Sequence, residues 1–363
     1  MRGEVDPQSS MFHYFSVESR IPAEHPLRRV KKLAETALSA ISGELDGLYA
    51  RTGRPSIPPE RLLKAQLLIA LYSVRSDRLF CEQLDYNLLF RWFLDLNLES
   101  GGLDQSNFSR LRERLVETDI ARRFFDEVVR LARRDKLLSS DHFTVDGTLI
   151  DAWASFKSFK RKNDDEPPKP GDGTGMVDFK SEKRSNATHQ STTDPEAKLM
   201  RKGTGQPARL SYGGHALMEN RSGLCVDLLI TDATLAEHKA ARQLLTRARR
   251  RRIHPKTLGA DKGYHVKDFV QHLREHNIRP HIARIDGRTT PGLDGRTTRT
   301  EGYKISQRKR KRVEEIFGWL KTVGGMRKTR FIGQAKTQIA AYLSAAAYNL
   351  LRIAKLQSAG SAA

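Results

Sequence analysis

The sequence predicts a mixed α/β protein in which an all-helical part precedes a sheet. Three observations lead to this prediction. Apolar residues recur at helical spacing through the first ~138 residues. A β-rich segment follows at 142–146, and strand and helix patterns alternate after it. The chain of 363 residues carries 38% hydrophobic residues, which is enough to build a core. It contains no internal repeat.

The helical part is predicted to span 1–138, beginning with an extended lead over 1–24. A first helix is expected within 25–50, where Leu27, Val30 and Leu33 share one face. Ser56 followed by Pro58 and Pro59 is typical of a helix start. Further helices are expected at 59–74, 77–86, 88–95, 105–116 and 119–136. A helix-turn-helix within 59–93 would suit DNA binding, although helical spacing alone identifies no recognition helix.

The sheet-containing part is predicted to span 139–330. Its first strand, 142–146, is expected to end at an Asp-Gly turn formed by Asp146 and Gly147. A hairpin then joins two strands through a glycine-bearing turn at 220–223. The expected elements are the strands 209–219, 223–231, 256–261 and 278–283, the helices 235–251, 266–276 and 304–323, and a loop at 286–300.

Two further segments differ in composition from the rest. Residues about 156–208 are rich in Lys, Asp, Gly, Pro, Ser and Thr and poor in apolar residues, so they are expected to form a mobile insertion. The final segment, 331–363, is expected to hold a helix at about 335–356 and a tail.

The charge balance indicates a polyanionic partner. Sixty-four Lys and Arg residues outnumber 43 Asp and Glu residues, giving a formal charge of +21. Nucleic acid is the first candidate, and a ribosomal-type or merely solvated basic surface is the alternative. Cys81 and Cys225 have no Cys-x-x-Cys partner, which excludes zinc ribbons and suits a reducing compartment. No signal peptide and no membrane-spanning apolar run is present, so a soluble cytoplasmic protein is expected.

Three acidic residues form a candidate metal site. Asp146 and Asp261 each follow an apolar predicted strand, and Glu314 lies on a predicted helix. Sheet folds place ligand chemistry at the carboxyl ends of strands. Three carboxylates suit Mg²⁺, which prefers oxygen ligands. Two such ions about 3.5–4 Å apart can support in-line transfer at phosphorus, with water or a DNA 3′-hydroxyl as the nucleophile.

The helix around Glu314 carries cations on the same face as the carboxylate. Arg310, Glu314 and Lys321 fall together at ~3.6 residues per turn. This face suits a metal ion beside a phosphate backbone, with Arg310 and Lys321 as phosphate contacts. The ordinary alternative is a solvated charged face opposite an apolar stripe.

These segments resemble bacterial insertion-sequence transposases of the Asp-Asp-Glu (DDE) type, over roughly residues 11–355. The matching motifs are Thr-Val-Asp-Gly-Thr around Asp146, Gly-Ala-Asp-Lys-Gly-Tyr around Asp261, and Arg-x3-Glu-x6-Lys around Glu314. The resemblance implies an RNase H-like mixed sheet flanked by helices, preceded by a helical DNA-binding domain. It implies that the three acidic residues are catalytic and bind two Mg²⁺ ions, with Mn²⁺ as a substitute.

One position departs from the family pattern. The family tyrosine of the third motif is Gln307 here, so Tyr303 or Tyr264 is a possible substitute. Glu315 is a rival to Glu314, but only Glu314 fits both spacings. The expected DNA-binding residues are Arg310, Lys321, Lys262, Tyr264, Arg308 and Arg312.

Other residues give weaker indications. His215 is a possible phosphate contact, with a buried, hydrogen-bonded histidine as the favoured alternative. Asp151 follows Asp146 by five residues and would point elsewhere if the strand continued. Trp319 could stack on a base, but core packing is the favoured interpretation.

The sequence therefore predicts a transposase that binds the terminal inverted repeats of its element as double-stranded DNA. It is expected to cut the ends and join them to target DNA. Synapsis of two ends implies at least a homodimer, acting in the bacterial cytoplasm at the nucleoid. The rival interpretations are a related metal-dependent nuclease that does not join ends, and a catalytically silent sequence-specific DNA-binding protein.

Overall fold

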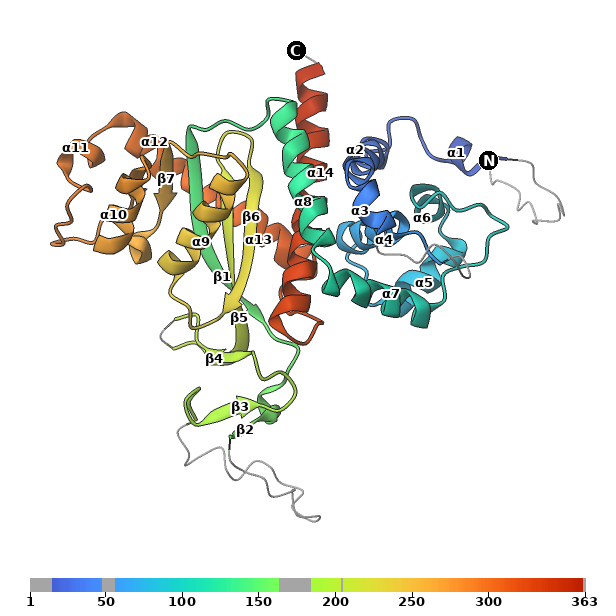
Figure 1. Ribbon diagram of the computed structural model, residues 1–363, viewed down its shortest axis with the longest axis horizontal. Helices are drawn as coiled ribbons and strands as arrows, with labels where there is room; N and C mark the ends of the chain where they lie inside the picture. Colours follow the sequence, from blue (N-terminus) through green and yellow to red (C-terminus); the bar gives the residue numbers. More distant parts are fainter. Residues whose placement is uncertain (1–14, 48–55, 163–183, 204, 362–363) are drawn as a thin grey trace, which may run out of the picture.

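The computed structural model describes residues 15–47, 56–162, 184–203 and 205–361. A group of helices from the first part of the chain lies to one side of a sheet-containing part, and two long helices lie between them (Figure 1). Among the described residues, no helix is both long and apolar enough to cross a membrane.

The helical part contains α1 to α8. Hydrogen bonds from capping side chains start several of these helices: Ser76 caps α5, Asn87 caps α6 and Asp104 caps α7. Two expectations need correction, because α1 forms within the predicted extended lead and the predicted helix at 25–50 divides into α2 and α3. The bounds are α1 Val17–Arg20, α2 Leu27–Ala40, α3 Ser42–Asp46, α4 Pro59–Leu71, α5 Asp77–Tyr86, α6 Leu88–Phe93, α7 Gln105–Glu117 and α8 Ile120–Arg134.

A mixed sheet is built around β1 (His142–Asp151). On one side β1 pairs antiparallel with β5 (Arg209–Glu219), which pairs antiparallel with β6 (Leu224–Asp232). On the other side β1 pairs parallel with β7 (Thr257–Ala260), which pairs parallel with β8 (Arg279–Ile282). The order β6-β5-β1-β7-β8, with antiparallel pairing on the β5 side of β1 and parallel pairing on its β7 side, is an RNase H-like sheet.

Strand β1 is longer than the sequence pattern suggested. It continues through Asp146 and Gly147 to Asp151, and Gly147 lies opposite His215 in the ladder with β5. The expected Asp-Gly turn is therefore wrong. The glycine has a packing reason instead, because a Cβ at Gly147 would lie only 2.7 Å from Glu237 Oε1 and 3.1 Å from His215 Nδ1.

Helices cover both faces of the sheet. Alternate residues of a strand point to opposite faces. Thr148 receives a hydrogen bond from Lys321 of α13 (Val313–Thr322), whereas the neighbouring Gly147 lies against Glu237 of α9 (Glu237–Arg250). Helices α13 and α9 therefore pack on opposite faces of β1. Next to α9, α10 (Lys267–Glu275) connects β7 to β8 (Figure 1).

The predicted helix 304–323 is divided in two. Helix α12 (Glu301–Lys309) is followed by a 3-10 turn, Arg310–Arg312, and then by α13. A short helix, α11 (Gly295–Thr298), also forms inside the predicted loop 286–300. The tight turn thus separates Arg310 from the helix that carries Glu314.

Part of the expected insertion 156–208 is ordered, as a separate two-stranded sheet and as one strand of the main sheet. A 3-10 turn (Phe156–Ser158) leads into β2 (Phe159–Arg161), which pairs with β3 (His189–Ser191), and β4 (Lys198–Met200) pairs with β5. Asp194 is fully buried, and both of its carboxylate oxygens lie 2.7 Å from the Tyr212 hydroxyl, which donates to them. The expectation of a wholly mobile insertion is wrong for 184–203, while 163–183 lies outside the described residues.

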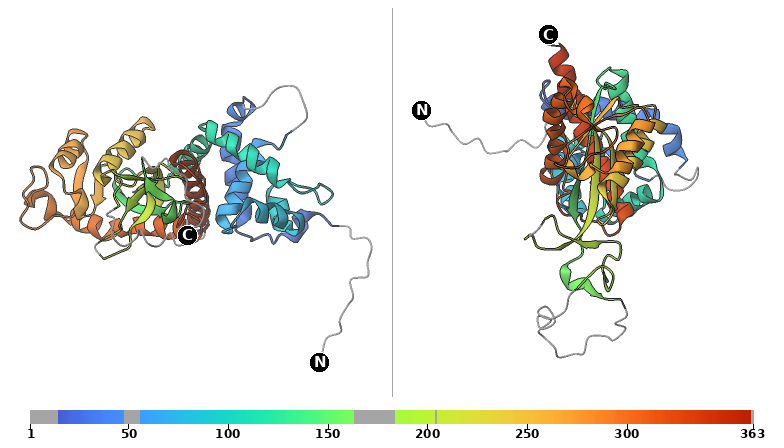
Figure 2. Two further views of the ribbon diagram at one scale, coloured as in Figure 1. Left: turned by 90° about the horizontal axis from the view of Figure 1, so that it is seen from below. Right: turned by 90° about the vertical axis from the view of Figure 1, so that its left-hand side faces the viewer.

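The last helix, α14 (Gln334–Ser361), joins the two parts of the chain. It packs against α8 and α4 on one side and against β6 on the other, and Figure 2 shows it between the sheet and the helical part. Its side chains also cover the free edge of β6. The Gln338 side chain accepts a hydrogen bond from the Ile230 N–H and donates one to the Leu228 carbonyl. The Asn349 side chain accepts from the Cys225 N–H and donates to the Cys225 carbonyl. These bonds replace the neighbouring strand that the edge lacks.

Candidate active site

Two of the predicted carboxylates lie side by side because of the strand register. The parallel ladder between β1 and β7 includes the pair Thr144 and Gly259. Asp146 and Asp261 each follow that pair by two residues, so they lie at the same level, where β7 ends and β1 continues. Backbone N–H groups orient both carboxylates: Gly147 N donates to Asp146 Oδ1 and Gly263 N donates to Asp261 Oδ1, each over 2.8 Å.

The third predicted carboxylate approaches from the helix. Glu314 lies in the first turn of α13, and its charge acts on Asp146 together with that of Asp261. Glu315 points elsewhere, because its two carboxylate oxygens lie 4.0 Å from Arg312 and from Arg352. The structure thus places Asp146 and Asp261 side by side with Glu314 near enough for its charge to act on Asp146, and it pairs Glu315 with two arginines instead.

Burial and neighbouring carboxylates dominate the electrostatics of Asp146. Burial raises the pKa of Asp146 to about 6, and the charges of Asp261 and Glu314 raise it further. The Gly147 N–H and the Arg310 guanidinium act in the opposite direction and lower this pKa. Within the described part of the chain, none of the three carboxylates forms an ion pair with a basic side chain.

The donor chemistry of this site fits a hard divalent cation. All of its candidate ligands are carboxylate oxygens, the type that Mg²⁺ takes. The carboxylate oxygens of the three residues do not all lie within 4.8 Å of one another. Among the described residues, one other group of possible metal ligands meets that spacing.

Two predicted cations border the carboxylates. Lys321 Nζ donates to Thr148 Oγ1 over 2.6 Å, and Thr148 shares a strand face with Asp146. Arg310 packs beside β7, because a Cβ added at Gly259 would lie 3.4 Å from the Cβ of Arg310. Arg310 Nε donates to Gln307 Oε1 over 3.1 Å. Lys262 is exposed directly after Asp261, in the 3-10 turn Lys262–Tyr264.

Some of the predicted DNA-contacting side chains are buried or already hydrogen-bonded within the protein. Tyr264 is fully buried, which corrects its assignment as a DNA contact and leaves it unable to replace the family tyrosine at the surface. Tyr303 donates its hydroxyl to the Ile282 carbonyl over 3.0 Å, so it too is engaged. Arg312 donates to the carbonyls of Asn220 and Arg221, each over 2.7 Å, and therefore ties α13 to the hairpin turn. Arg308 is exposed, 3.8 Å from Glu301.

Sequence reasoning missed one acidic residue at this site. Glu237 is the first residue of α9, and its carboxylate lies against Gly147. Burial raises the pKa of Glu237, and the charges of Asp146 and Asp261 raise it as well, while Tyr264 lowers it. Glutamate is common in the first turn of a helix because it interacts favourably with the helix dipole. A glutamate at a helix start is therefore no sign that its charge interacts with the two aspartates.

His215 lies behind the same glycine. It is buried, its Nε2 is 3.0 Å from Thr231 Oγ1, and burial lowers its pKa to about 4. Its Nδ1 has no hydrogen-bond partner among the described residues and faces Gly147. The favoured prediction for this residue, a buried histidine, agrees with this position. Asp151 instead pairs with Arg209 over 2.7 Å, at the far end of β1.

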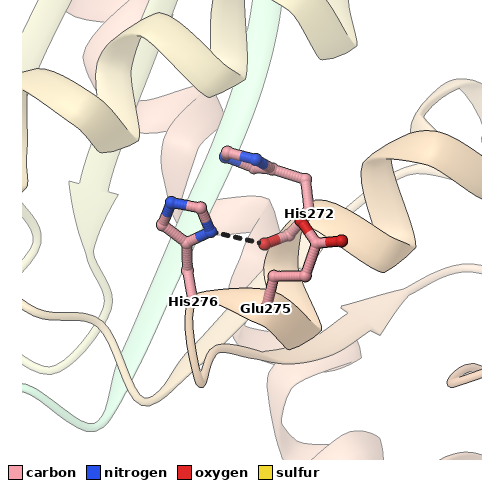
Figure 3. A group of neighbouring side chains, drawn as sticks. All are labelled: His272, Glu275 and His276. Atoms are coloured by element: carbon pink, nitrogen blue, oxygen red, sulfur yellow. Dashed lines mark hydrogen bonds between the residues drawn. The ribbon is translucent and has the colours of Figure 1, made fainter.

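A second group of possible metal ligands lies elsewhere. His272, Glu275 and His276 meet at the end of α10, where His276 Nδ1 is 2.9 Å from the His272 carbonyl oxygen (Figure 3). Helix α10 begins shortly after Asp261, so this group lies at the end of the helix remote from the carboxylates. Gln271 already donates to Glu275 over 2.8 Å, and the charges of Arg242 and Arg249 oppose a cation there.

The fold and the site together define a class of protein: enzymes with an RNase H-like sheet that carries acidic residues on β1, after β7 and on a following helix. Two family models match the chain, a transposase domain over residues 15–114 and a transposase DDE domain over residues 179–350. The chain belongs to the DDE transposases. Asp261 and Glu314 lie within the matched segments, whereas Asp146 lies between them.

Solved structures of transposases with bound DNA are also similar to the chain. The piggyBac transposase synaptic complex with hairpin DNA shares 11% identity and a TM-score of 0.40, covering 92% of this chain and 76% of that one. The pre-cleavage Mos1 transpososome shares 11% identity and a TM-score of 0.21, covering 84% and 82%. No match was found among curated proteins.

Proposed function

We propose that this protein is a DNA transposase that binds the terminal inverted repeats of its insertion sequence, cuts them and joins the 3′-ends to target DNA. The single observation that carries this proposal is the register of Asp146 and Asp261, with Glu314 facing them from α13. Membership of the DDE family supports it. The basic charge of +21 suits double-stranded DNA as the partner in the bacterial cytoplasm.

The three carboxylates would hold two Mg²⁺ ions, and Mn²⁺ could replace them. When bound, such ions lower the pKa of an attacking water and stabilise the charge on phosphorus and on the leaving oxygen. Lys321 and Arg310 would hold the phosphates on either side of the scissile bond. The Gly147 and Gly263 N–H groups keep the two aspartates oriented without substrate.

The chemistry comprises two displacements at phosphorus. Water attacks the phosphate at the element end, a new P–O bond forms, the P–O3′ bond breaks, and the freed 3′-oxygen takes a proton. The 3′-hydroxyl then attacks a target phosphate, loses its proton, and displaces the target 3′-oxygen. One phosphodiester bond replaces another in this second step, so joining requires no external energy source. Bringing two ends together requires at least a homodimer.

The test is an assay with a labelled terminal-repeat end and a target plasmid, with and without Mg²⁺. The wild-type protein is expected to give both cut and joined products in Mg²⁺, and Asp146→Asn neither. Cleavage without joining would favour the related nuclease. Binding without cleavage in Mg²⁺ or Mn²⁺, unchanged by Asp146→Asn, would favour a catalytically silent DNA-binding protein and overturn the proposal.

A further inference from the structure

The end of α10 holds nitrogen and oxygen donors that the carboxylate site does not use. His272, Glu275 and His276 are spaced so that they share one face of the helix end. Their ligand atoms all lie within 4.8 Å of one another, and Figure 3 shows the three side chains together. The ring centroids of the two histidines are 4.2 Å apart. A single metal ion could therefore contact all three side chains.

A hydrogen bond to the backbone prepares His276 as a ligand. Its Nδ1 is 2.9 Å from the His272 carbonyl oxygen, which can only accept, so Nδ1 carries the hydrogen. In the neutral ring the free lone pair is then on Nε2. Histidines that bind metals in proteins commonly donate their other ring N–H to a carbonyl or carboxylate in this way. The bond thus selects the tautomer and the ring orientation that a metal ligand needs.

The other two donors are also available. Among the described residues, the His272 ring nitrogens have no hydrogen-bond partner. Gln271 donates to Oε1 of Glu275 over 2.8 Å, which orients the carboxylate and leaves Oε2 free. Two imidazoles and one carboxylate suit zinc and the neighbouring transition metals better than they suit Mg²⁺.

The backbone that carries these donors is held by a regular helix end. Asn277 has a φ of 58°, and its N–H donates to the Arg274 carbonyl over 3.0 Å. The Ile278 N–H donates to the Leu273 carbonyl over 2.8 Å. These two bonds form a Schellman motif, which ends the helix directly after His276. The motif fixes the position of the His276 backbone relative to the preceding turn.

Two arginines of α9, Arg242 and Arg249, oppose a cation at this place. Arg249 is exposed, so solvent and salt screen its charge. Arg242 donates to the Asp268 carbonyl, one helical turn before His272. Burial lowers the pKa of His272, and His276 and the two arginines lower it further. The same charges therefore keep the His272 ring neutral, which is the form that binds a metal.

The ordinary alternative is a pair of cationic histidines that interact with the dipole at the end of the helix. A histidine with that role has its pKa raised, because the dipole favours the charged ring. The pKa of His272 is lowered instead, and its ring lies against a second imidazole. The arrangement therefore favours neutral donors.

We propose that His272, Glu275 and His276 bind a zinc ion at the end of α10, with water completing its coordination. This site goes beyond the proposed function, because it lies at the end of α10 remote from Asp261 and needs no DNA. The bound ion would connect the last turn of α10 to the residue that ends it, and so stabilise the turn that leads into β8.

The test titrates Zn²⁺ into the untagged full chain by calorimetry, with Mg²⁺ in excess so that the carboxylate site does not take up zinc. His272→Gln and His276→Gln should each weaken zinc binding by about tenfold or more, since each removes a ligand. The matched control, His254→Gln, changes an exposed histidine outside the group and should bind as wild type does. Asp146→Asn should also leave this affinity unchanged.

Amide hydrogen exchange of the wild-type chain locates the ion without any substitution. Zinc should slow exchange in the last turn of α10 and at residues 276–278, and should leave α5 unchanged. Absence of zinc binding by the wild-type chain, protection confined to other segments, or unchanged affinity in both histidine variants would overturn the inference.

The outcomes for the two proposals are distinct. Zinc binding that depends on His272 and His276, in a protein that never cuts DNA, would uphold this site while the proposed function fails. Transposition by a protein whose zinc affinity is the same in both variants would uphold the proposed function and overturn the zinc site.

Discussion

Asp146 and Asp261 lie at the same level of two neighbouring parallel strands, each two residues beyond the paired Thr144 and Gly259. Because β7 stops at Ala260 while β1 continues to Asp151, the edge of β1 is open at this level. Backbone N–H groups hold both carboxylates, so the pair exists before any ligand arrives. Four predictions follow from this site and from the fold that positions it.

Glu314→Gln is expected to abolish Mg²⁺-dependent cleavage and to spare binding of the DNA end, because it removes a carboxylate that acts on Asp146. Glu315→Gln is the matched control, since Glu315 faces Arg312 and Arg352 and should retain near wild-type cleavage. A gel assay of nicked and bound DNA measures both. The reverse result, with Glu315→Gln inactive and Glu314→Gln active, would move the third ligand to Glu315.

Lys321→Met is expected to reduce cleavage and to lower the slope of log affinity against log salt by about 1, as the loss of one phosphate contact requires. Thr148→Val removes the hydroxyl that receives the Lys321 hydrogen bond but retains the charge. It should therefore keep the wild-type salt slope. Filter binding over a range of salt concentrations measures this slope, and an unchanged slope in Lys321→Met would exclude the phosphate contact.

Tyr212→Phe is expected to destabilise the fold by about 1–3 kcal/mol, because it leaves the buried Asp194 carboxylate without the hydroxyl that donates to it. Tyr86→Phe, at a tyrosine that is 65% exposed, should change the free energy of unfolding little. Urea denaturation followed by circular dichroism gives both values. Equal stability of the two variants would mean that the segment around Asp194 does not contribute to the stability of the sheet.

His281 is expected to make the protein sensitive to acid. Burial lowers its pKa from 6.5 to about 4, with smaller contributions from His142, Arg279 and Arg274. Between these two values the unfolded chain binds more protons than the folded chain, so stability falls as pH drops from 6.5 to 4. The loss is about 3 kcal/mol at most.

Melting temperatures measured across that pH range test this expectation. His281→Gln should flatten the dependence, and the exposed His254→Gln should leave it unchanged. A slope that is the same in all three proteins would show that the titration of His281 makes no contribution.

The sequence predicted the parts of the fold that depend on local pattern. The order of strands and helices after residue 139 and the three acidic motifs follow from apolar spacing and from residue types that the chemistry needs. Features that depend on tertiary contacts were missed. Asp-Gly at 146–147 looks like a turn, and only the ladder to β5 and the carboxylate of Glu237 explain why it is a strand. The same holds for β4, whose short polar stretch is held by pairing with β5.

The remaining errors have a similar origin. Tyr264 matched the motif as a surface residue, but packing of α9 and α10 buries it. Glu237 carries no motif, because its contact with Gly147 comes from where α9 begins relative to β1. The residues at the start of α9 do not indicate how that helix is placed against β1, which is far away in the sequence.

The side chains of α14 that occupy the edge of β6 have a consequence for the genetics of such an element. A gene copy interrupted before Gln334 would encode a chain with the acidic residues intact but with the β6 backbone uncovered. Bare strand edges recruit other chains, so we expect this product to aggregate. Decayed copies of the element would then be silent, and would not compete with an intact copy for its DNA ends.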